Sequence, residues 1–466
     1  MNNPIKVIVA AYLSFQWLQV SMTILVANLM SVDLGVVQVI RIGETYIPIN
    51  EQTRPAILFG LAALVATTIG FRLLAPRLPN FRPELRNLSL QKLFIVYLAL
   101  FAVSQSVGPF TGGGLAQPLL VLGWLRFVPA VLLLVRWLTL RDGMLFLLAV
   151  GAIEIVTGFL GYFSGFRVVF FVMGAATLAL HHALQGRVIR ILAAAAVVTL
   201  LLGSVWTAIK PTYRETINLG TGQQRVLLSV PERLELLTDL LGRMSGSDLA
   251  DGFAGLAVRI SYVHYLADAM LHVPRMVPHE NGALWGEAIT NTTMPRAFFP
   301  GKPVLGSDSA RTNRYTGRRL AGDDEGTSVS MGYVADSYVD FGVVGALLVC
   351  LALGAFYGAI ARTIVFLNRD PELTALVAVL VILFFPIQDF GVTNTKLLGG
   401  IVWRAIVCSI FMSALWPRLR DFCARQRRRS LRPRPAASVV PARVVAQRAR
   451  PSAPDDPEGQ ASRRGQ

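Results

Sequence analysis

The side chains best suited to chemistry gather between positions 160 and 340. The candidate binding cations in this region are Arg167, Arg259, Arg296, Lys302, Arg311, Arg314, Arg318 and Arg319. An arginine stays charged, and its planar guanidinium contacts phosphate oxygens bidentately, so these residues suit the binding of an anionic group. The candidate catalytic carboxylates and imidazoles of the region are His264, His279, Glu280, Glu287 and Asp336. Such groups can act as general bases when they lie within hydrogen-bond reach of a substrate proton.

Each candidate also has a plainer structural interpretation. Arg167 opens an apolar run, where a long cation can snorkel to a membrane interface. The loop cations can form a solvated face that pairs locally, and Arg259 can pair with Asp251 or Asp268. A histidine is more often structural than catalytic, and Asp336 stands where a helix start favours an acid.

The composition shows what kind of scaffold must position these residues. The chain has 466 residues, of which 53% are hydrophobic and only 15% charged, and its mean hydropathy is +0.53. Ordinary soluble domains carry about 25% charged residues, so a soluble enzyme and a mainly disordered chain are both excluded. The net charge of +16 is concentrated near the C-terminus, where residues 417–466 hold 13 arginines against four acids. Cationic ends beside membrane spans explain this better than nucleic acid binding does.

Ten segments are long and apolar enough for membrane spans, which need about 20 mainly apolar residues. They are 5–28, 55–75, 91–110, 115–137, 143–162, 166–184, 187–206, 338–362, 372–388 and 399–416. The first is interpreted as a retained span, and the short stretch 31–42 as an interfacial piece. The predicted fold is therefore an all-α polytopic membrane protein.

The placement of Lys and Arg predicts the orientation. With both termini in the cytoplasm, the cytoplasmic short loops hold twelve basic residues and the opposite short loops four, as the positive-inside rule requires. The predicted organisation is seven spans in 1–206, a large external loop at 207–332, three spans in 333–416 and a basic, disordered cytoplasmic tail at 417–466. Within the loop, 249–273 has helical apolar spacing, whereas MPRAFFPGKP at 294–303 is irregular.

An ordered set of motifs resembles a known family. SGFR, ending at Arg167, opens a predicted span, and the long loop carries PRAFFPGKP from Pro295 to Pro303. The loop closes with TSVSMGYVADSYVDFGVVG, from Thr327 to Gly345. This arrangement resembles the Wzy-type polymerases, the oligosaccharide repeat unit polymerases of O-antigen and exopolysaccharide pathways. Asp336 and Asp340 stand where the family pattern often has Glu and Asn.

The resemblance implies a metal-independent glycosyltransferase with a GT-C-like fold in the bacterial inner membrane, without cofactor. A nascent glycan would leave its polyprenyl diphosphate and join the next lipid-linked repeat unit at the outer face of that membrane. Arg167 is then the first choice for the diphosphate, with Arg259 and the 296–319 cations completing the pocket. Asp336, Glu287, His264, His279 and Glu280 are the candidate catalytic residues. The implied partners are the lipid-linked oligosaccharide, membrane lipids, a flippase and a chain-length regulator, and no nucleic acid.

Two charges fall inside predicted spans. Arg126 and Glu154 lie near the middle of neighbouring antiparallel segments, where an unpaired charge is expensive. We expect them to meet, either as a structural pair or as part of a substrate cavity or proton path.

Three other functions remain open at this point. An O-antigen ligase uses the same lipid donor, a polysaccharide or lipid transporter would keep its critical polar residues within the spans, and a scaffold would bind glycan without reacting it. The three cysteines have no spacing typical of zinc ligands or of a disulfide framework.

Overall fold

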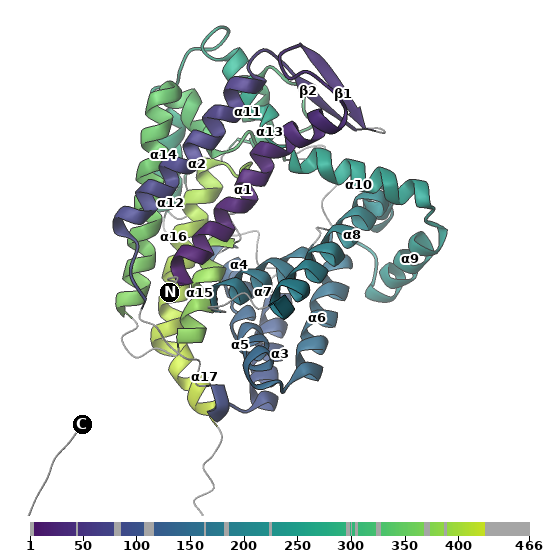
Figure 1. The fold of residues 1–466 in the computed structure, drawn as a ribbon, viewed down its shortest axis with the longest axis vertical. Coiled ribbons are helices and arrows are strands. Elements are labelled where there is room, and N and C mark those ends of the chain that lie inside the picture. The colour runs from purple at the N-terminus through teal and green to yellow at the C-terminus, as the bar shows by residue number, and fades with distance from the viewer. Residues whose placement is uncertain are drawn as a thin grey trace, which may run out of the picture. The chain divides into compact units, whose positions relative to one another are not determined.

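The computed structural model describes residues 4–42, 45–78, 85–106, 116–162, 165–180, 186–222, 226–294, 299, 301–302, 306–322, 328–367, 373–385 and 389–424. In this part the protein is almost entirely helical, as the composition predicts (Figure 1). Residues 425–466 and most of 294–303 lie outside the described residues, so the expectations for the tail and for Arg296 have no structural counterpart here.

The first half of the chain begins with α1 (Pro4–Leu29), the hairpin β1 (Gln38–Ile42) and β2 (Thr45–Ile49), and α2 (Thr53–Leu74). It continues with α3 (Leu90–Ser106), α4 (Ala116–Trp124), α5 (Phe127–Leu140), α6 (Met144–Phe159), α7 (Arg167–Leu180) and α8 (Gly186–Ile217). The predicted span 115–137 is thus two helices, divided at Leu125 and Arg126.

The second half contains α9 (Val230–Arg243), α10 (Gly246–Ile260), α11 (His264–His272), α12 (Ala283–Thr293) and α13 (Asp308–Thr316). It ends with α14 (Tyr333–Leu367), α15 (Leu373–Phe384), α16 (Asn394–Ile410) and α17 (Trp416–Cys423), the last two joined by a π-helical turn at Phe411–Leu415. The predicted loop is therefore mostly helical, and α8 continues eleven residues beyond position 206.

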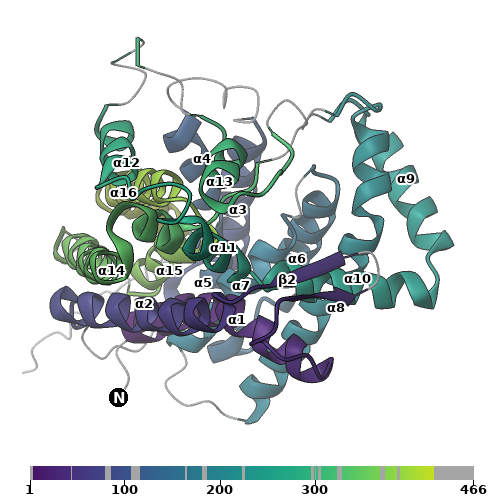
Figure 2. The same cartoon turned by 90° about the horizontal axis from the view of Figure 1, so that it is seen from above.

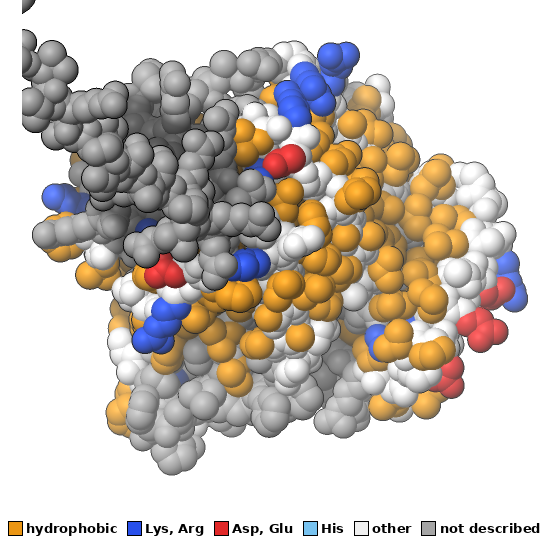
Figure 3. All heavy atoms as spheres, turned by 90° about the horizontal axis from the view of Figure 1, so that it is seen from below, with side chains coloured by type: hydrophobic (Ala, Val, Ile, Leu, Met, Phe, Trp, Pro, Cys, Tyr) orange, Lys and Arg blue, Asp and Glu red, His pale blue; other side chains and the backbone are white. Residues whose placement is uncertain are grey.

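Among the described residues, six helical segments are long and apolar enough to cross a membrane, when α4 is taken together with α5 and α16 with α17. They are Pro4–Leu29, Thr53–Leu74, Leu119–Leu140, Gly186–Ile217, Tyr333–Leu367 and Asn394–Cys423. The other four predicted segments form shorter apolar helices, at Leu90–Ser106, Met144–Phe159, Arg167–Leu180 and Thr374–Phe384. Hydrophobic side chains also dominate the molecular face in Figure 3. The protein is a multi-pass membrane protein.

The centre of the bundle is formed by α5 and α15, which pack against each other and against α7. Ala375–Leu383 of α15 and Phe127–Leu133 of α5 are almost completely buried. A helix that is apolar on all sides belongs in such a position, whereas an amphipathic one lies at a surface. Polar residues are therefore confined to the ends of these helices and to the helices around them.

The stretch 31–42, predicted to be interfacial, instead contributes a strand to the hairpin. Ile40 pairs with Ile47, and both are buried while Val39 and Tyr46 are exposed. This alternation of buried and exposed residues is the period-two pattern of a half-buried sheet. The run between turns is too short for the pattern to stand out in the sequence.

The predicted helix 249–273 is divided into α10 and α11, although it contains no proline. The Tyr262 backbone N–H donates to the Gln19 carbonyl oxygen over 3.1 Å, and the Ser261 and Thr23 hydroxyls lie 2.5 Å apart. These bonds to α1 replace helical ones. Figures 1 and 2 show α10 continuing beside α8 and α11 turning towards α13.

Helices α2 and α14 pack closely because glycines lie between them. A Cβ atom at Gly354 would overlap the Thr67 carbonyl oxygen, and one at Gly70 would overlap the Leu351 carbonyl oxygen. Gly358 lies one turn after Gly354, so the contact resembles the small-residue motif of membrane helix pairs.

Gly354→Ala should lower the melting temperature of the detergent-solubilised protein, because overpacking of this kind costs about 1–3 kcal/mol. Gly174→Ala in α7 is the matched control, since no atom lies within 4 Å of its Cβ position. The control should melt at or slightly above the wild-type temperature, because alanine has the higher helix propensity. Equal melting of the two variants would show that the α2–α14 contact tolerates a wider spacing.

Helix α14 is kinked at Gly342, which has φ 68° and ψ −169°. This left-handed conformation is open to glycine and strained for other residues. The kink separates the first turns of α14, which carry Asp336 and Asp340, from the long apolar part. The sequence motif FG-x-x-G therefore marks a bend in the backbone.

Candidate functional site

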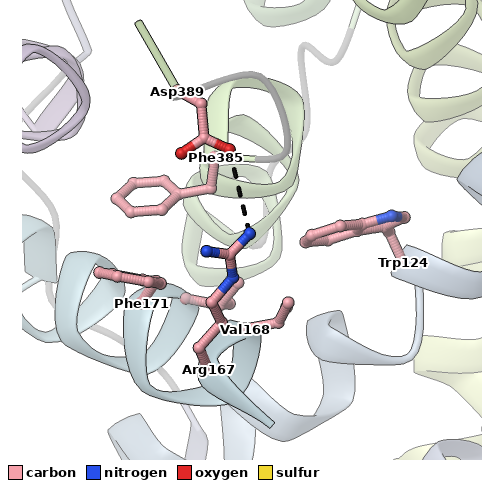
Figure 4. Close-up of a pocket in the computed structure, with 7 residues that line it drawn as sticks. Trp124, Arg167, Val168, Phe171, Phe385 and Asp389 are labelled. Carbon is pink, nitrogen blue, oxygen red and sulfur yellow. Dashed lines mark ion pairs between the residues drawn. The ribbon is translucent and has the colours of Figure 1, made fainter. Parts of the chain in front are cut away.

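Arg167 is the first residue of α7, and its side chain projects into a small cavity (Figure 4). Stacking of Phe166 on Phe159, with ring centroids 4.3 Å apart, fixes the start of the helix. The cavity has a volume of about 110 Å³. Its lining consists of Trp124, Arg167, Val168, Phe171, Val172, Phe385 and Asp389.

Asp389 is the carboxylate opposite Arg167 in this cavity. Its Oδ2 lies 4.0 Å from the Arg167 Nη2, and the two side chains are 37% and 50% exposed. Arg167 is thus held by a loose, half-exposed ion pair that another anion can reach. Asp389 follows α15 in the sequence and had no motif to single it out.

A second arginine acts on the same cavity from α10. Arg259 is exposed, and it makes no hydrogen bond or ion pair with any residue in the described ranges. Although part of the side chain is exposed, the surrounding protein desolvates the guanidinium and lowers its pKa. The charge of Arg167 lowers the pKa further, and Tyr262 and Asp389 oppose the shift. Two guanidiniums therefore act around one carboxylate, which makes this region favourable for an anion.

Most of the remaining predicted cations that the structure describes have local partners. Lys302 donates to the carbonyl oxygens of Asn291 (2.8 Å) and Met294 (3.0 Å), at the C-terminal end of α12. Arg314 pairs with Glu280 at 2.8 Å, and Arg318 pairs with Asp268. Arg319 is exposed. A cation at a helix C-terminus is favoured by the helix dipole, so Lys302 has a structural role.

Arg311 joins two of the predicted catalytic acids. Its Nη2 donates to Glu287 Oε2 over 2.5 Å, its Nη1 donates to Asn394 Oδ1 over 3.1 Å, and its Nη1 lies 3.9 Å from Asp336 Oδ1. The Glu287 side chain is 39% exposed and that of Asp336 is fully buried. Only Glu287 of this pair can therefore meet a substrate directly.

The acids of the closing motif support the starts of two helices. Asp336 Oδ2 accepts from the Asn394 N–H over 2.9 Å at the first residue of α16. Asp340 accepts from the N–H groups of Leu284 (3.1 Å) and Trp285 (2.8 Å) in the first turn of α12. A carboxylate at a helix N-terminus satisfies free N–H groups and complements the dipole. An asparagine side chain can also accept such hydrogen bonds.

The histidines and Glu280 lie in well-packed surroundings. His264 is buried, and burial, followed by the charge of Arg318, lowers its pKa to about 3. His279 Nδ1 lies 3.1 Å from the Val339 carbonyl oxygen, to which it donates. Glu280 accepts from Arg314 and from the Tyr315 hydroxyl, both over 2.8 Å. These contacts fix α11–α13 on the first turns of α14.

The short segment 389–394 links two charged groups. One consists of Arg167 and Asp389, and the other of Arg311, Glu287 and Asp336. Asp389 faces Arg167 at one end, and Asn394 binds Arg311 and Asp336 at the other. Five residue steps span at most about 18 Å, which limits the distance between the Cα atoms of Asp389 and Asn394. The segment is held by a hydrogen bond from the Phe390 N–H to Gln19 Oε1 (2.6 Å) and by one from the Ser330 hydroxyl to the Gly391 carbonyl oxygen.

The expected contact between Arg126 and Glu154 is present. Arg126 Nε and Nη2 lie 2.6 and 2.9 Å from the Glu154 oxygens, and the Tyr97 hydroxyl donates to Glu154 over 3.0 Å. Arg126 also donates to the Gly123 carbonyl oxygen over 2.6 Å. The pair thus stabilises the break between α4 and α5. Arg126, at this break, follows Trp124 of the cavity lining by two residues.

Glu154→Gln should destabilise the protein by about 3–5 kcal/mol, because it leaves the Arg126 charge without a carboxylate in the membrane. The measurement is the melting temperature and the yield of folded protein. The double variant Arg126→Met/Glu154→Met removes both charges and should recover most of the loss. A double variant as unstable as Glu154→Gln would indicate that packing, and not charge compensation, dominates here.

The comparisons with known proteins identify one family. No curated protein and no solved structure matches the sequence. Residues 5–410, which include the bundle and both charged groups, match the family described as Domain of unknown function (DUF8712). The protein therefore belongs to this family.

Proposed function

We propose that this protein polymerises polyprenyl-diphosphate-linked oligosaccharide repeat units by glycosyl transfer at the outer face of the bacterial inner membrane. In this proposal all ten apolar helices cross the membrane, both termini lie in the cytoplasm, and α9–α13 lie outside. The motif resemblance and the asymmetry of the basic residues support this arrangement. Figure 1 is compatible with it, because α11 and α13 lie at one end of the bundle and α17 at the other.

The observation that carries the proposal is the cavity at Arg167. It combines a half-exposed guanidinium, a second guanidinium nearby and an aromatic lining of Trp124, Phe171 and Phe385. A lipid-linked sugar diphosphate offers an anionic group for the arginines and apolar or ring surfaces for the aromatic residues. The loose pair with Asp389 can open as the diphosphate binds.

The proposed reaction breaks the bond between the anomeric carbon of the donor and the diphosphate oxygen. A bond forms between that carbon and a hydroxyl oxygen of the acceptor repeat unit. Arg167 and Arg259 stabilise the negative charge that develops on the leaving diphosphate. Asp389, on the wall of the same cavity, takes the hydroxyl proton. Arg311 with Glu287, at the other end of the segment 389–394, binds the acceptor glycan.

Deletion of the gene distinguishes this function from ligation. A strain without a polymerase attaches single repeat units to the final acceptor, whereas a strain without a ligase accumulates polymer on the lipid. We expect single repeat units, and polymer on the lipid would favour the ligase.

Cysteine labelling in intact cells tests the proposed orientation. Cys350, Cys408 and Cys423 are buried, so a cysteine introduced at the exposed Ser247 should dominate labelling by a membrane-impermeant maleimide. Labelling only after cell lysis would place this loop in the cytoplasm and would overturn the proposal.

A further inference from the structure

Helix α9 lies at the edge of the molecule, beside α8 and away from the centre of the bundle (Figure 2). Its apolar residues recur at the spacing of one helix face, at Val230, Leu234, Leu237 and Leu241. The charged residues of the opposite face are Glu232, Glu235, Asp239 and Arg243. The helix is therefore strongly amphipathic.

Helix α8 covers only part of the apolar face of α9. Leu237 is buried, and it belongs to a hydrophobic cluster with Trp206, Ile209 and Tyr213 of α8. The other three apolar residues, Val230, Leu234 and Leu241, are 55%, 46% and 42% exposed. At 3.6 residues per turn these three point within about 40° of one another, directly beside Leu237. A narrow apolar strip therefore stays uncovered next to the packed one.

Hydrogen bonds place α9 at the level where two apolar helices end. Arg233 Nη1 donates to the Leu160 carbonyl oxygen over 2.5 Å, directly after the last residue of α6. The Leu227 N–H, just before α9, donates over 2.8 Å to the carbonyl oxygen of Ile217, the last residue of α8. Near the same end of α6, the Val156 side chain is 47% exposed, as suits contact with lipid. The uncovered strip of α9 therefore lies at the boundary between the acyl chains and the headgroups.

A lipid surface fits this strip better than a second protein does. Three side chains fall well short of the area of about 800 Å² per partner that a stable protein interface buries. Helix α9 carries three acids and two arginines, so it is not a basic patch for anionic lipid phosphates. An apolar strip with polar residues opposite it is typical of helices that lie in the plane of a membrane.

We propose that α9 is an interfacial helix, with Val230, Leu234 and Leu241 inserted among the lipid acyl chains and its polar face in water. Apolar contact, and not charge, holds it there. Phe166, which precedes Arg167, belongs to the same hydrophobic cluster as Leu237. The inserted helix therefore also fixes the depth of the Arg167 cavity relative to the headgroups. The proposal does not rest on the proposed glycosyl transfer.

Fluorescence quenching by brominated lipids tests the position of α9 in the full chain. Bimane is attached to Leu234→Cys, because the three native cysteines are buried, and the protein is reconstituted in phosphatidylcholine vesicles. Lipids brominated near the headgroup end of the acyl chain should quench about half of the fluorescence, because an interfacial helix buries its apolar face about 5–10 Å deep. Iodide in the water should quench little. Salt at about 1 M should leave the lipid quenching unchanged, because it screens charges and does not weaken apolar contact.

Two matched positions supply the controls. Glu235→Cys is exposed on the polar face, so iodide should quench its label and the brominated lipids should hardly do so. Leu201→Cys, exposed near the middle of α8, should be quenched most by lipids brominated near the methyl end of the chain. Leu241→Cys repeats the test on the same strip if Leu234→Cys fails to fold.

Three results overturn the proposal. Equal lipid quenching at Leu234→Cys and Glu235→Cys, or quenching of Leu234→Cys by iodide alone, would show that the strip does not enter the membrane. A label at Leu234→Cys that neither quencher reaches would show that a protein surface covers the strip. Loss of the lipid quenching in salt would show that charge holds α9 at the membrane.

Discussion

Arg167→Ala is expected to abolish chain extension, with a loss of at least about 10²–10³-fold in rate while the protein remains inserted and abundant. Loss of one preorganised donor at a developing negative charge has this size in other enzymes. The Arg167 side chain is half exposed and its ion pair is loose, so its removal should cost little stability. Glycan length in a complemented deletion strain and turnover of purified lipid-linked repeat units are the two measurements.

Two matched variants make this result specific. Arg167→Lys keeps the charge but loses the planar fork, and it should retain part of the activity. Arg319→Ala removes another exposed arginine, from the stretch between α13 and α14, and it should extend chains normally. Normal polymer in Arg167→Ala would remove the residue from the mechanism. Equal losses in Arg167→Ala and Arg319→Ala would point to the overall charge of this face and not to a specific site.

The sequence predicted the scaffold well because the membrane imposes a strong pattern. Each of the ten apolar segments coincides with an apolar helix, six of them long enough to span. The pairing of Arg126 with Glu154 followed from the cost of a lone charge in lipid. The division of 249–273 into α10 and α11 could not be predicted, because it depends on bonds from Ser261 and Tyr262 to a helix more than 200 residues earlier.

The candidate site was predictable only in part, for a related reason. Arg167 stands in a motif, but Asp389, its neighbour in the cavity, lies between two helices of the C-terminal half. The cations predicted in the loop are less free to bind a ligand than the sequence indicated, because Arg311, Arg314 and Arg318 each form an ion pair with a carboxylate. Such pairing depends on how α11, α12 and α13 pack, and a count of basic residues along the chain does not contain it.

The second prediction with a large expected effect concerns Asp389, the general base of the proposed reaction. Asp389→Asn should reduce turnover by about 10²–10⁴-fold, because general base catalysis contributes a factor of this size. The amide keeps the size and shape of the side chain but cannot take the acceptor proton. The loss should appear mainly in kcat, with KM for the donor unchanged or lower, since Asp389 no longer competes with the diphosphate for Arg167.

Glu287→Gln separates the two possible bases. Glu287 is held by Arg311 at 2.5 Å and does not line the cavity, so its loss should mainly raise KM for the acceptor. If Glu287→Gln lost kcat and Asp389→Asn did not, the proton would be taken at Arg311, and the transfer would occur at the other end of the segment 389–394. The comparison of these two variants therefore tests where the bond to the acceptor forms, and a kcat loss confined to Asp389→Asn would assign it to the cavity of Arg167.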